Sequence, residues 1–179
     1  MIRPTGGDQL LVLATINSGL YKTLLVLHVL TAIVGLGAVM LNGLYFQQAT
    51  RRPGPPGRAV SEANFSVSTV GEYFIYAIPV FGILLVLASD KAWKFSQTWI
   101  WLSLVLYVVA IGLSHAILIP GHKRINKLRA EMEQDPSAGG TTAQQTEMTS
   151  LANKQAVTGA LLDVFVVIFL ILMIWKPGT

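Results

Sequence analysis

Apolar residues in this chain gather in four long runs, which charged, proline-rich or glycine-rich stretches separate. A helix needs about 20 apolar residues to cross a hydrocarbon core about 30 Å thick, and each run has about that length. Because lipid offers the backbone no hydrogen bonds, such segments cross it as helices. The pattern predicts four membrane-spanning helices, over residues 21–46, 70–88, 98–120 and 155–175.

A shorter apolar stretch, residues 9–20, precedes the first run. It is too short to cross the core by itself, so it forms either an interfacial helix along the membrane surface or an extension of the first span. The interfacial reading is favoured. The predicted fold is therefore all-α, a polytopic four-transmembrane-helix bundle with an N-terminal interfacial helix, in a single membrane domain that covers residues 1–179.

The two basic connections between spans have different compositions. Residues 51–58 read Arg-Arg-Pro-Gly-Pro-Pro-Gly-Arg, in which the prolines and glycines cannot continue a helix, so they predict a loop within residues 47–69. The connection after the third span continues helically through a basic and then an acidic stretch. Residues 134–150 are polar, small and rich in helix breakers, which predicts a mobile cytoplasmic loop.

Basic residues predict the orientation of the spans. Eight of the 13 Lys and Arg residues lie in the two loops 47–69 and 121–154, and five lie in the other polar segments. Since cytoplasmic loops carry the excess of Lys and Arg, both loops are predicted to be cytoplasmic and both termini outside. An aromatic belt agrees with this, because five rings fall near the predicted outer surface: Tyr21, Trp93, Trp99, Trp101 and Trp175.

The composition excludes several classes of protein. Hydrophobic residues make up 53% of the chain and charged residues only 12%, where a soluble domain carries roughly a quarter charged. The net charge of +4 comes from residues that flank apolar runs, so it indicates a lipid bilayer as partner and not a nucleic acid. The chain has no cysteine, which excludes disulfides, thiolate metal ligands and iron–sulfur clusters.

Polar side chains at membrane depth are costly and tend to mark function. The candidate residues for a ligand or proton site are His28, Asn42, Glu72, His115 and Asp163. A helix rises 1.5 Å per residue and the spans alternate in direction, so His28 and His115 differ by roughly 18 Å in height, whereas Asp163 lies about 6 Å from the level of His115. We expect Asp163 and His115 to act on the inner half of the membrane, with Glu72 and Asn42 nearby, and His28 on the outer half.

The same residues leave several functions open. The first hypothesis is a site that binds or conducts a proton, a small ion or a haem-like ligand. The difference in depth argues against one haem held by both histidines, but a haem with a single histidine ligand is compatible with the sequence, and the metal is unknown. The alternative is a non-catalytic structural or assembly subunit, paired with other membrane subunits or a second copy, in which these groups only join helices.

Catalysis is the weaker hypothesis. The chain shows no nucleophile elbow, phosphate loop or His-Glu-x-x-His motif, so a role without catalysis is expected, and a redox enzyme is the third choice. Glu72 also has a plainer interpretation, as a carboxylate in the first turn of its span that still reaches water. His122, next to Lys123 and Arg124, is interpreted as an interfacial residue and not as a ligand.

Two segments resemble a known family. They are Leu-His-Val-Leu-Thr-Ala-Ile-Val-Gly-Leu-Gly at residues 27–37 and Trp-Ile-Trp-Leu-Ser-Leu-Val-Leu-Tyr at residues 99–107. They are similar to domain of unknown function 2269, a family of predicted bacterial integral membrane proteins, and the likeness extends over most of the chain from about Tyr21 onward. It implies a multi-pass protein of the bacterial inner membrane and no particular activity, since that family has no established biochemical role.

The first segment also resembles two other membrane families. These are the CopD-type copper-resistance proteins and the four-helix protoporphyrinogen oxidases, and both likenesses would place a role on His28 alone. The chain departs from the oxidases because no Arg or Lys lies deep in a span. It departs from the copper proteins because no further intramembrane His or Met lies at the level of His28.

Overall fold

The computed structural model describes residues 16, 18–52, 54–134 and 141–178. Its elements are the α-helices α2 (Gly19–Thr50), α3 (Pro55–Leu87), α4 (Thr98–Leu113), α5 (Ile119–Gln134) and α6 (Thr142–Trp175), and the π-helical turn η1 (Ser114–Leu118). No strand occurs in these ranges, and the predicted all-α class is confirmed. Most of the predicted interfacial helix over residues 9–20 lies outside the described residues.

Four helices are long and apolar enough to cross a membrane, and they confirm the four predicted spans. They are α2, α3, the continuous helix Thr98–Met132 formed by α4, η1 and α5, and α6. Each helix is longer than the span predicted for it, because polar residues continue the helix beyond the hydrocarbon.

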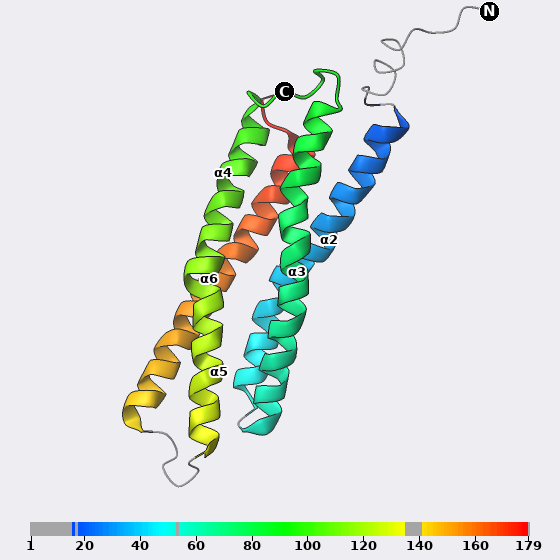
Figure 1. Ribbon diagram of the computed structural model, residues 1–179. Helices are drawn as coiled ribbons and strands as arrows, with labels where there is room; N and C mark the ends of the chain where they lie inside the picture. Colours follow the sequence, from blue (N-terminus) through cyan, green and yellow to red (C-terminus); the bar gives the residue numbers. More distant parts are fainter. Residues whose placement is uncertain (1–15, 17, 53, 135–140, 179) are drawn as a thin grey trace, which may run out of the picture.

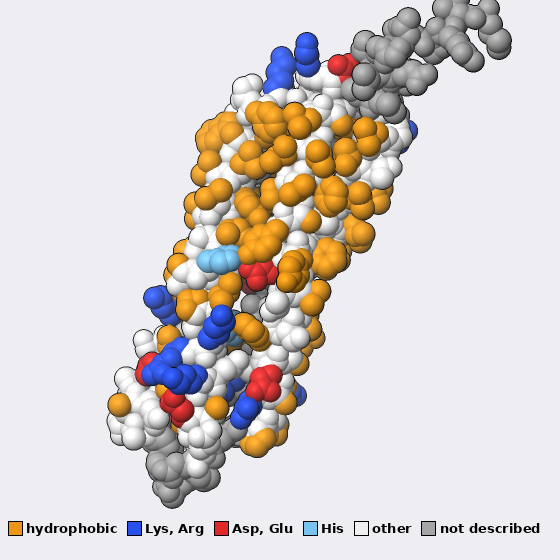
Figure 2. Space-filling view, in the orientation of Figure 1, with side chains coloured by type: hydrophobic (Ala, Val, Ile, Leu, Met, Phe, Trp, Pro, Cys, Tyr) orange, Lys and Arg blue, Asp and Glu red, His pale blue; other side chains and the backbone are white. Residues whose placement is uncertain are grey.

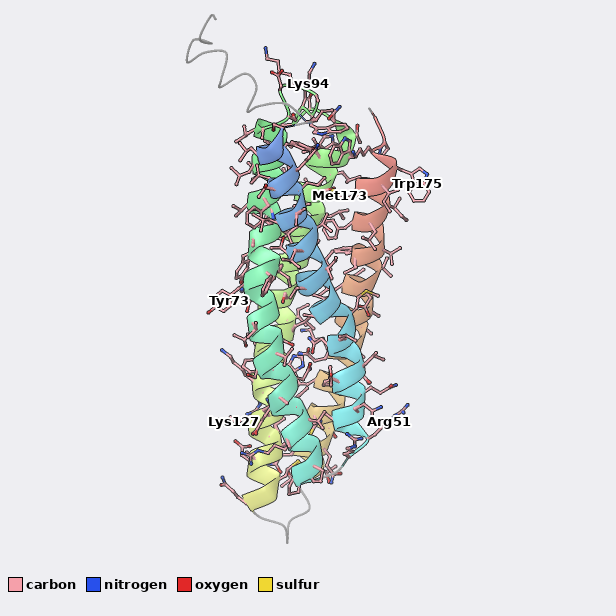
Figure 3. All side chains as sticks on the ribbon, turned by 90° about the vertical axis from the view of Figure 1, so that its right-hand side faces the viewer. Arg51, Tyr73, Lys94, Lys127, Met173 and Trp175 are labelled. Atoms are coloured by element: carbon pink, nitrogen blue, oxygen red, sulfur yellow. The ribbon has the colours of Figure 1, made fainter. Side chains whose placement is uncertain are left out.

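The four helices run side by side along a common axis (Figure 1). The first turn of α2 and the C-terminus lie at one end of the bundle, which we call the terminal end. The last turns of α2 and α5 and the first turns of α3 and α6 lie at the other end, which we call the basic end. Figure 3 shows Lys94 at the terminal end, and Arg51 and Lys127 toward the basic end.

Both predicted loops at the basic end are shorter in the structure. α3 begins at Pro55, within the segment 51–58 that was predicted as a loop, and α6 begins at Thr142, within the predicted loop 134–150, so both predictions were wrong in extent. Proline is favoured in the first turn of a helix because its missing N–H would have had no partner there. The side chain of Thr141 accepts from the backbone N–H of Gln144, whose own side chain bonds back to Thr141, and this capping box starts α6.

The third span contains a π-helical turn. In η1 the backbone N–H of Ile119 donates to the carbonyl of Ser114, five residues back. The next residue is Pro120, which has no N–H to donate and so weakens the regular α-helical pattern here. Turns of this kind recur at functional sites, and this one carries His115.

Small residues bring α2 and α3 into close contact. A Cβ atom built on Gly35 would lie 3.0 Å from the backbone nitrogen of Ile75, and one built on Gly71 would lie 2.6 Å from the Cβ atom of Ala38. Without a hydrophobic drive between helices in lipid, such close backbone approach is what favours their association. We call these four residues the α2–α3 seam.

The outer surface of the bundle is apolar toward the terminal end. Figure 2 shows apolar side chains over this part of one face and charged side chains gathered toward the basic end. Only 11–22% of the most apolar segment of each spanning helix is buried inside the protein. The remaining apolar surface is suited to contact with lipid chains.

Aromatic residues join the helices at the terminal end. The indole N–H of Trp93 donates to the hydroxyl of Tyr21 at 2.9 Å, and the rings of Trp93 and Trp99 pack edge to face at 5.6 Å. The Nζ atom of Lys176 lies 4.0 Å from the centre of the Trp93 ring. This cluster ties the α3–α4 connection to α2 and to the end of α6.

Candidate functional site

Three titratable side chains form a hydrogen-bonded cluster between α3 and η1, which we call the polar triad: Glu72, Tyr76 and His115. The hydroxyl of Tyr76 bonds the Oε1 atom of Glu72 and lies 2.9 Å from the Nε2 atom of His115. The same Nε2 atom lies 3.2 Å from Oε1 of Glu72. Glu72 and Tyr76 are four residues apart on one face of α3, and the π turn presents His115 to them.

A fourth contact limits where the protons of the triad lie. The Nδ1 atom of His115 is 3.0 Å from the carbonyl oxygen of Ile111. Since a carbonyl only accepts hydrogen bonds, Nδ1 carries a proton, and Nε2 is the position that gains or loses one. Tyr76 has one hydroxyl proton and stands between two potential acceptors, Nε2 and the Glu72 carboxylate.

The triad extends from the outer face of the bundle to an interior cavity. The His115 side chain is 47% exposed and that of Glu72 is 30% exposed. Glu72 lines the cavity, whereas His115 and Tyr76 do not. Figure 2 shows a histidine beside an acidic side chain where the apolar surface gives way to charged residues. The triad therefore connects the surface of the bundle with the cavity.

The cavity has a volume of about 1500 Å³ and lies between the α2–α3 pair and the α4–α6 pair. It is larger than the roughly 300–1,000 Å³ typical of small-molecule sites. Its walls are mainly apolar, and its lining includes residues of both ends of the bundle, from Trp99 and Lys176 to Lys123 and Gln155. A cavity of this length and polarity is suited to an apolar molecule with a polar head.

Asp163 lines the cavity and is not part of the triad. Its Oδ1 atom is buried and has no hydrogen-bond partner among the residues that the structure describes. The sequence allowed a pair between Asp163 and His115, but His115 is instead engaged by Tyr76 and Glu72. Asp163 is thus an isolated acceptor in the cavity wall.

His28 lies in a separate environment on α2. Its Nδ1 atom is 3.0 Å from the carbonyl oxygen of Ile78 on α3, and its ring packs over Gly82. This contact leaves Nε2 as the nitrogen that could bind a metal or haem iron, in the arrangement that histidine ligands usually have. Within the described ranges, no group of three His, Asp or Glu side chains is close enough to hold a metal ion.

Asn42 contributes to the join between α2 and α3 near the basic end. The side-chain amide of Asn64 donates to the Oδ1 atom of Asn42, and Asn64 is buried. A second contact of this kind joins α3 to α5, where the hydroxyl of Ser61 donates to Asn126 at 2.8 Å. The contacts of Asn42 are those of a residue that holds helices together.

A second polar group lies at the basic end of the cavity and joins η1 to α6. The Nε2 atom of Gln155 lies 3.1 Å from the carbonyl oxygens of Ile117 and Leu118, and Nδ1 of His122 lies 3.1 Å from the same Leu118 oxygen. Both side chains are buried, at 4% and 8% exposed, and both line the cavity. Oε1 of Gln155 and Nε2 of His122 have no partner in the described part of the chain.

Comparison with known proteins places this architecture in a family. Residues 22–177 match a family described as predicted integral membrane protein, DUF2269. The chain belongs to this family. No curated protein and no solved structure matches it. The match confirms the resemblance to DUF2269 and the assignment as an integral membrane protein.

Three residues of this DUF2269 protein that line or form the two polar groups were not among the predicted site residues: Tyr76, His122 and Gln155. Tyr76 follows Glu72 by four residues and so lies on the same face of a helix, and this spacing was the available signal for the triad. His122 and Gln155 lie at the ends of predicted spans, where polar residues are ordinary. Their shared acceptor, the Leu118 carbonyl, becomes visible only once η1 and α6 are packed together.

Proposed function

We propose that this DUF2269 protein binds a proton at the polar triad and passes it between the outer face of the bundle and the interior cavity. The observation that carries the proposal is the Tyr76 hydroxyl, which bonds a carboxylate on one side and an imidazole on the other. Intramembrane groups arranged in this way are typical of proton relays.

The hydrogen bonds of the triad have two arrangements with the same number of protons. In one, Glu72 is ionised, Tyr76 donates to it, and the protonated Nε2 of His115 donates to the Tyr76 oxygen. In the other, Glu72 is protonated and donates to Tyr76, which donates to the neutral Nε2. The change from one to the other moves a positive charge from His115 toward the cavity, because the Nε2 proton of His115 passes to the Tyr76 oxygen as the Tyr76 hydroxyl proton passes to Glu72.

The step is completed when Glu72 releases one proton and His115 takes up another. His115 is half exposed and can take a proton from outside the bundle, and Glu72 can release one into the cavity that it lines. Asp163 offers a carboxylate acceptor in that cavity, since its Oδ1 atom has no partner among the described residues. The excess of Lys and Arg in the two basic loops supports an orientation with the triad near the cytoplasmic surface and both termini outside.

The decisive variant is Tyr76→Phe, which removes the hydroxyl and keeps the ring. In proteoliposomes with an internal pH-sensitive dye and an imposed potassium diffusion potential, we expect proton flux to fall by about tenfold or more, as for loss of a positioned proton carrier. Tyr73→Phe is the matched control, because Tyr73 lies on the same helix and is 71% exposed. Its side chain points away from the bundle in Figure 3.

The comparison with the control variant can also refute the proposal. Equal flux through Tyr76→Phe and Tyr73→Phe, with both proteins monodisperse and equally helical, would exclude a relay through the Tyr76 hydroxyl. An unmodified protein with no flux above empty liposomes would exclude conduction altogether. Infrared spectra in the absence of a potential would then show whether the triad still takes up a proton. If it does, the unmodified protein should show a band from a protonated carboxyl group that is absent in Glu72→Gln.

One observation favours a second function, that of an assembly subunit. The triad reaches the outer face of the bundle, where another membrane helix could bond it. In that case His115→Ala would release a partner or dissociate a homo-oligomer in mild detergent and would leave proton flux unchanged. Crosslinking in the membrane before solubilisation separates the two functions, because a relay does not require a partner helix.

A further inference from the structure

We propose that the cavity binds one anionic phospholipid with a polyol head, of the phosphatidylglycerol type, with its head at the His122–Gln155 group and its tail along the bundle. The inference does not depend on the proton relay, since neither His122 nor Gln155 belongs to the polar triad. Its basis is a pair of buried, unpartnered acceptors on two residues that line a large and mainly apolar cavity.

The His122–Gln155 group offers acceptors and no free donor. The amide nitrogen of Gln155 is 3.1 Å from two carbonyl oxygens, which only a donor can approach, so the atom left over is the acceptor Oε1. Nδ1 of His122 likewise donates to Leu118, and Nε2 of a neutral ring is then an acceptor. Since a buried acceptor without a donor costs free energy, a ligand head that supplies hydroxyl donors is favoured here.

The position of Gln155 is imposed by its surroundings. A Cβ atom built on Gly121 would overlap the Gln155 side-chain nitrogen, so the side chain passes directly over this glycine. Any larger residue at position 121 would force the amide away from the Ile117 and Leu118 carbonyls. The acceptor is therefore held in place by packing as well as by its hydrogen bonds.

Charge at the mouth of the cavity selects the rest of the head group. Lys123 is exposed, follows His122 in α5 and also lines the cavity. A phosphate beside Lys123 gains a favourable charge interaction at the membrane surface. A choline head has no N–H or O–H to give the two acceptors, and an ethanolamine head brings a cation toward Lys123. Glycerol phosphate satisfies both requirements.

The positions of His122 and Gln155 along their spans agree with the depth of a lipid head group. His122 follows the predicted third span by two residues, and Gln155 is the first residue of the predicted fourth span. Both therefore lie where the hydrocarbon gives way to head groups. From there the cavity continues past the apolar side chains of Leu162 and Phe169 toward Trp99 at the terminal end, which is the course of an acyl chain.

The test is lipid retention by the full chain. The protein is reconstituted in an equimolar mixture of phosphatidylglycerol, phosphatidylethanolamine and phosphatidylcholine with identical acyl chains, extracted in mild detergent and weighed by native mass spectrometry. We expect one phosphatidylglycerol per chain, preferred over phosphatidylcholine by about tenfold, as for two hydrogen bonds of ordinary strength. Equal retention of the three lipids, or no retained lipid, would overturn the proposal.

Two pairs of variants locate the head group. His122→Phe should lower phosphatidylglycerol retention by about five- to tenfold, whereas His115→Phe, a histidine of the same span that does not line the cavity, should leave it unchanged. Proton flux should fall in His115→Phe and stay unchanged in His122→Phe, so failure of the lipid proposal and failure of the relay can be told apart.

Lys123→Gln should weaken the preference for phosphatidylglycerol over phosphatidylethanolamine, and Lys127→Gln should not. If His122→Phe does not fold, the lysine pair decides the question, and equal behaviour of its two members refutes the site.

Discussion

The two sides of α2 differ in how closely they are packed. Toward α3, glycine and alanine bring the backbones together along the α2–α3 seam, and a single added methyl group at Gly71 would meet Ala38 at 2.6 Å. Toward α4 and α6, the helices leave a cavity of about 1500 Å³. In lipid, close approach is the main source of helix association, so the seam supplies stability and the loosely packed side is free to hold a ligand.

The largest effect on stability is expected at the seam. Gly71→Ala should lower the free energy of unfolding by about 1–3 kcal/mol, because the two Cβ atoms cannot both be accommodated without moving a helix. Denaturant titration in mixed micelles measures it. Gly112→Ala in α4 is the control, since a Cβ atom there meets nothing within 4 Å.

The double variant Ala38→Gly with Gly71→Ala sharpens this result. It removes the opposing methyl group, and it should recover most of the stability that Gly71→Ala loses if the loss comes from this one contact. If the double variant is as unstable as Gly71→Ala alone, the contact with the Ala38 methyl group is not the cause of the lost stability.

A larger substitution on the cavity side should cost less. A Cβ atom on Gly159 of α6 meets nothing within 4 Å, and this residue lines the cavity. Gly159→Leu should therefore change the free energy of unfolding by no more than about 1 kcal/mol, the scale of a helix-propensity change. The same titration measures stability, and native mass spectrometry should show less retained phosphatidylglycerol. Destabilisation as severe as that of Gly71→Ala would mean that the cavity closes in the membrane.

The smallest effect on stability is expected for Asp163→Asn. The carboxylate loses no hydrogen bond, because its buried oxygen has no partner among the described residues, so stability should change by about 0.5 kcal/mol or less. Proton flux should nevertheless fall, since an amide cannot accept the proton that Glu72 releases. Loss of folding with normal flux in the surviving fraction would assign Asp163 to structure.

Hydropathy sufficed to predict the spans, and it missed where the helices begin. Residues 142–154 are polar, so no apolar pattern marks them, yet the Thr141 capping box starts α6 there. Pro55 and Pro56 were read as breakers and instead open α3. In both cases a local backbone effect at the first turn outweighed the composition of the segment.

Two residues of the polar triad were among the predicted site residues, but the contacts that join the triad were not predicted. Glu72 and His115 were chosen because charge at membrane depth is costly, and that argument needs only the sequence. Depth along each helix also suggested Asp163 as a partner for His115. The structure pairs His115 with Tyr76 and Glu72 instead, because rotation of the third span about its axis determines which face meets α3.

The sequence by itself determined that this chain crosses a membrane four times, because the spans follow from how each residue interacts with lipid and water. The tertiary structure decided that Tyr76 joins Glu72 to His115, and that Gln155 and His122 share the Leu118 carbonyl at the end of a cavity. Such contacts depend on the rotation and spacing of whole helices, which small residues on several spans set together, so no single span carries them.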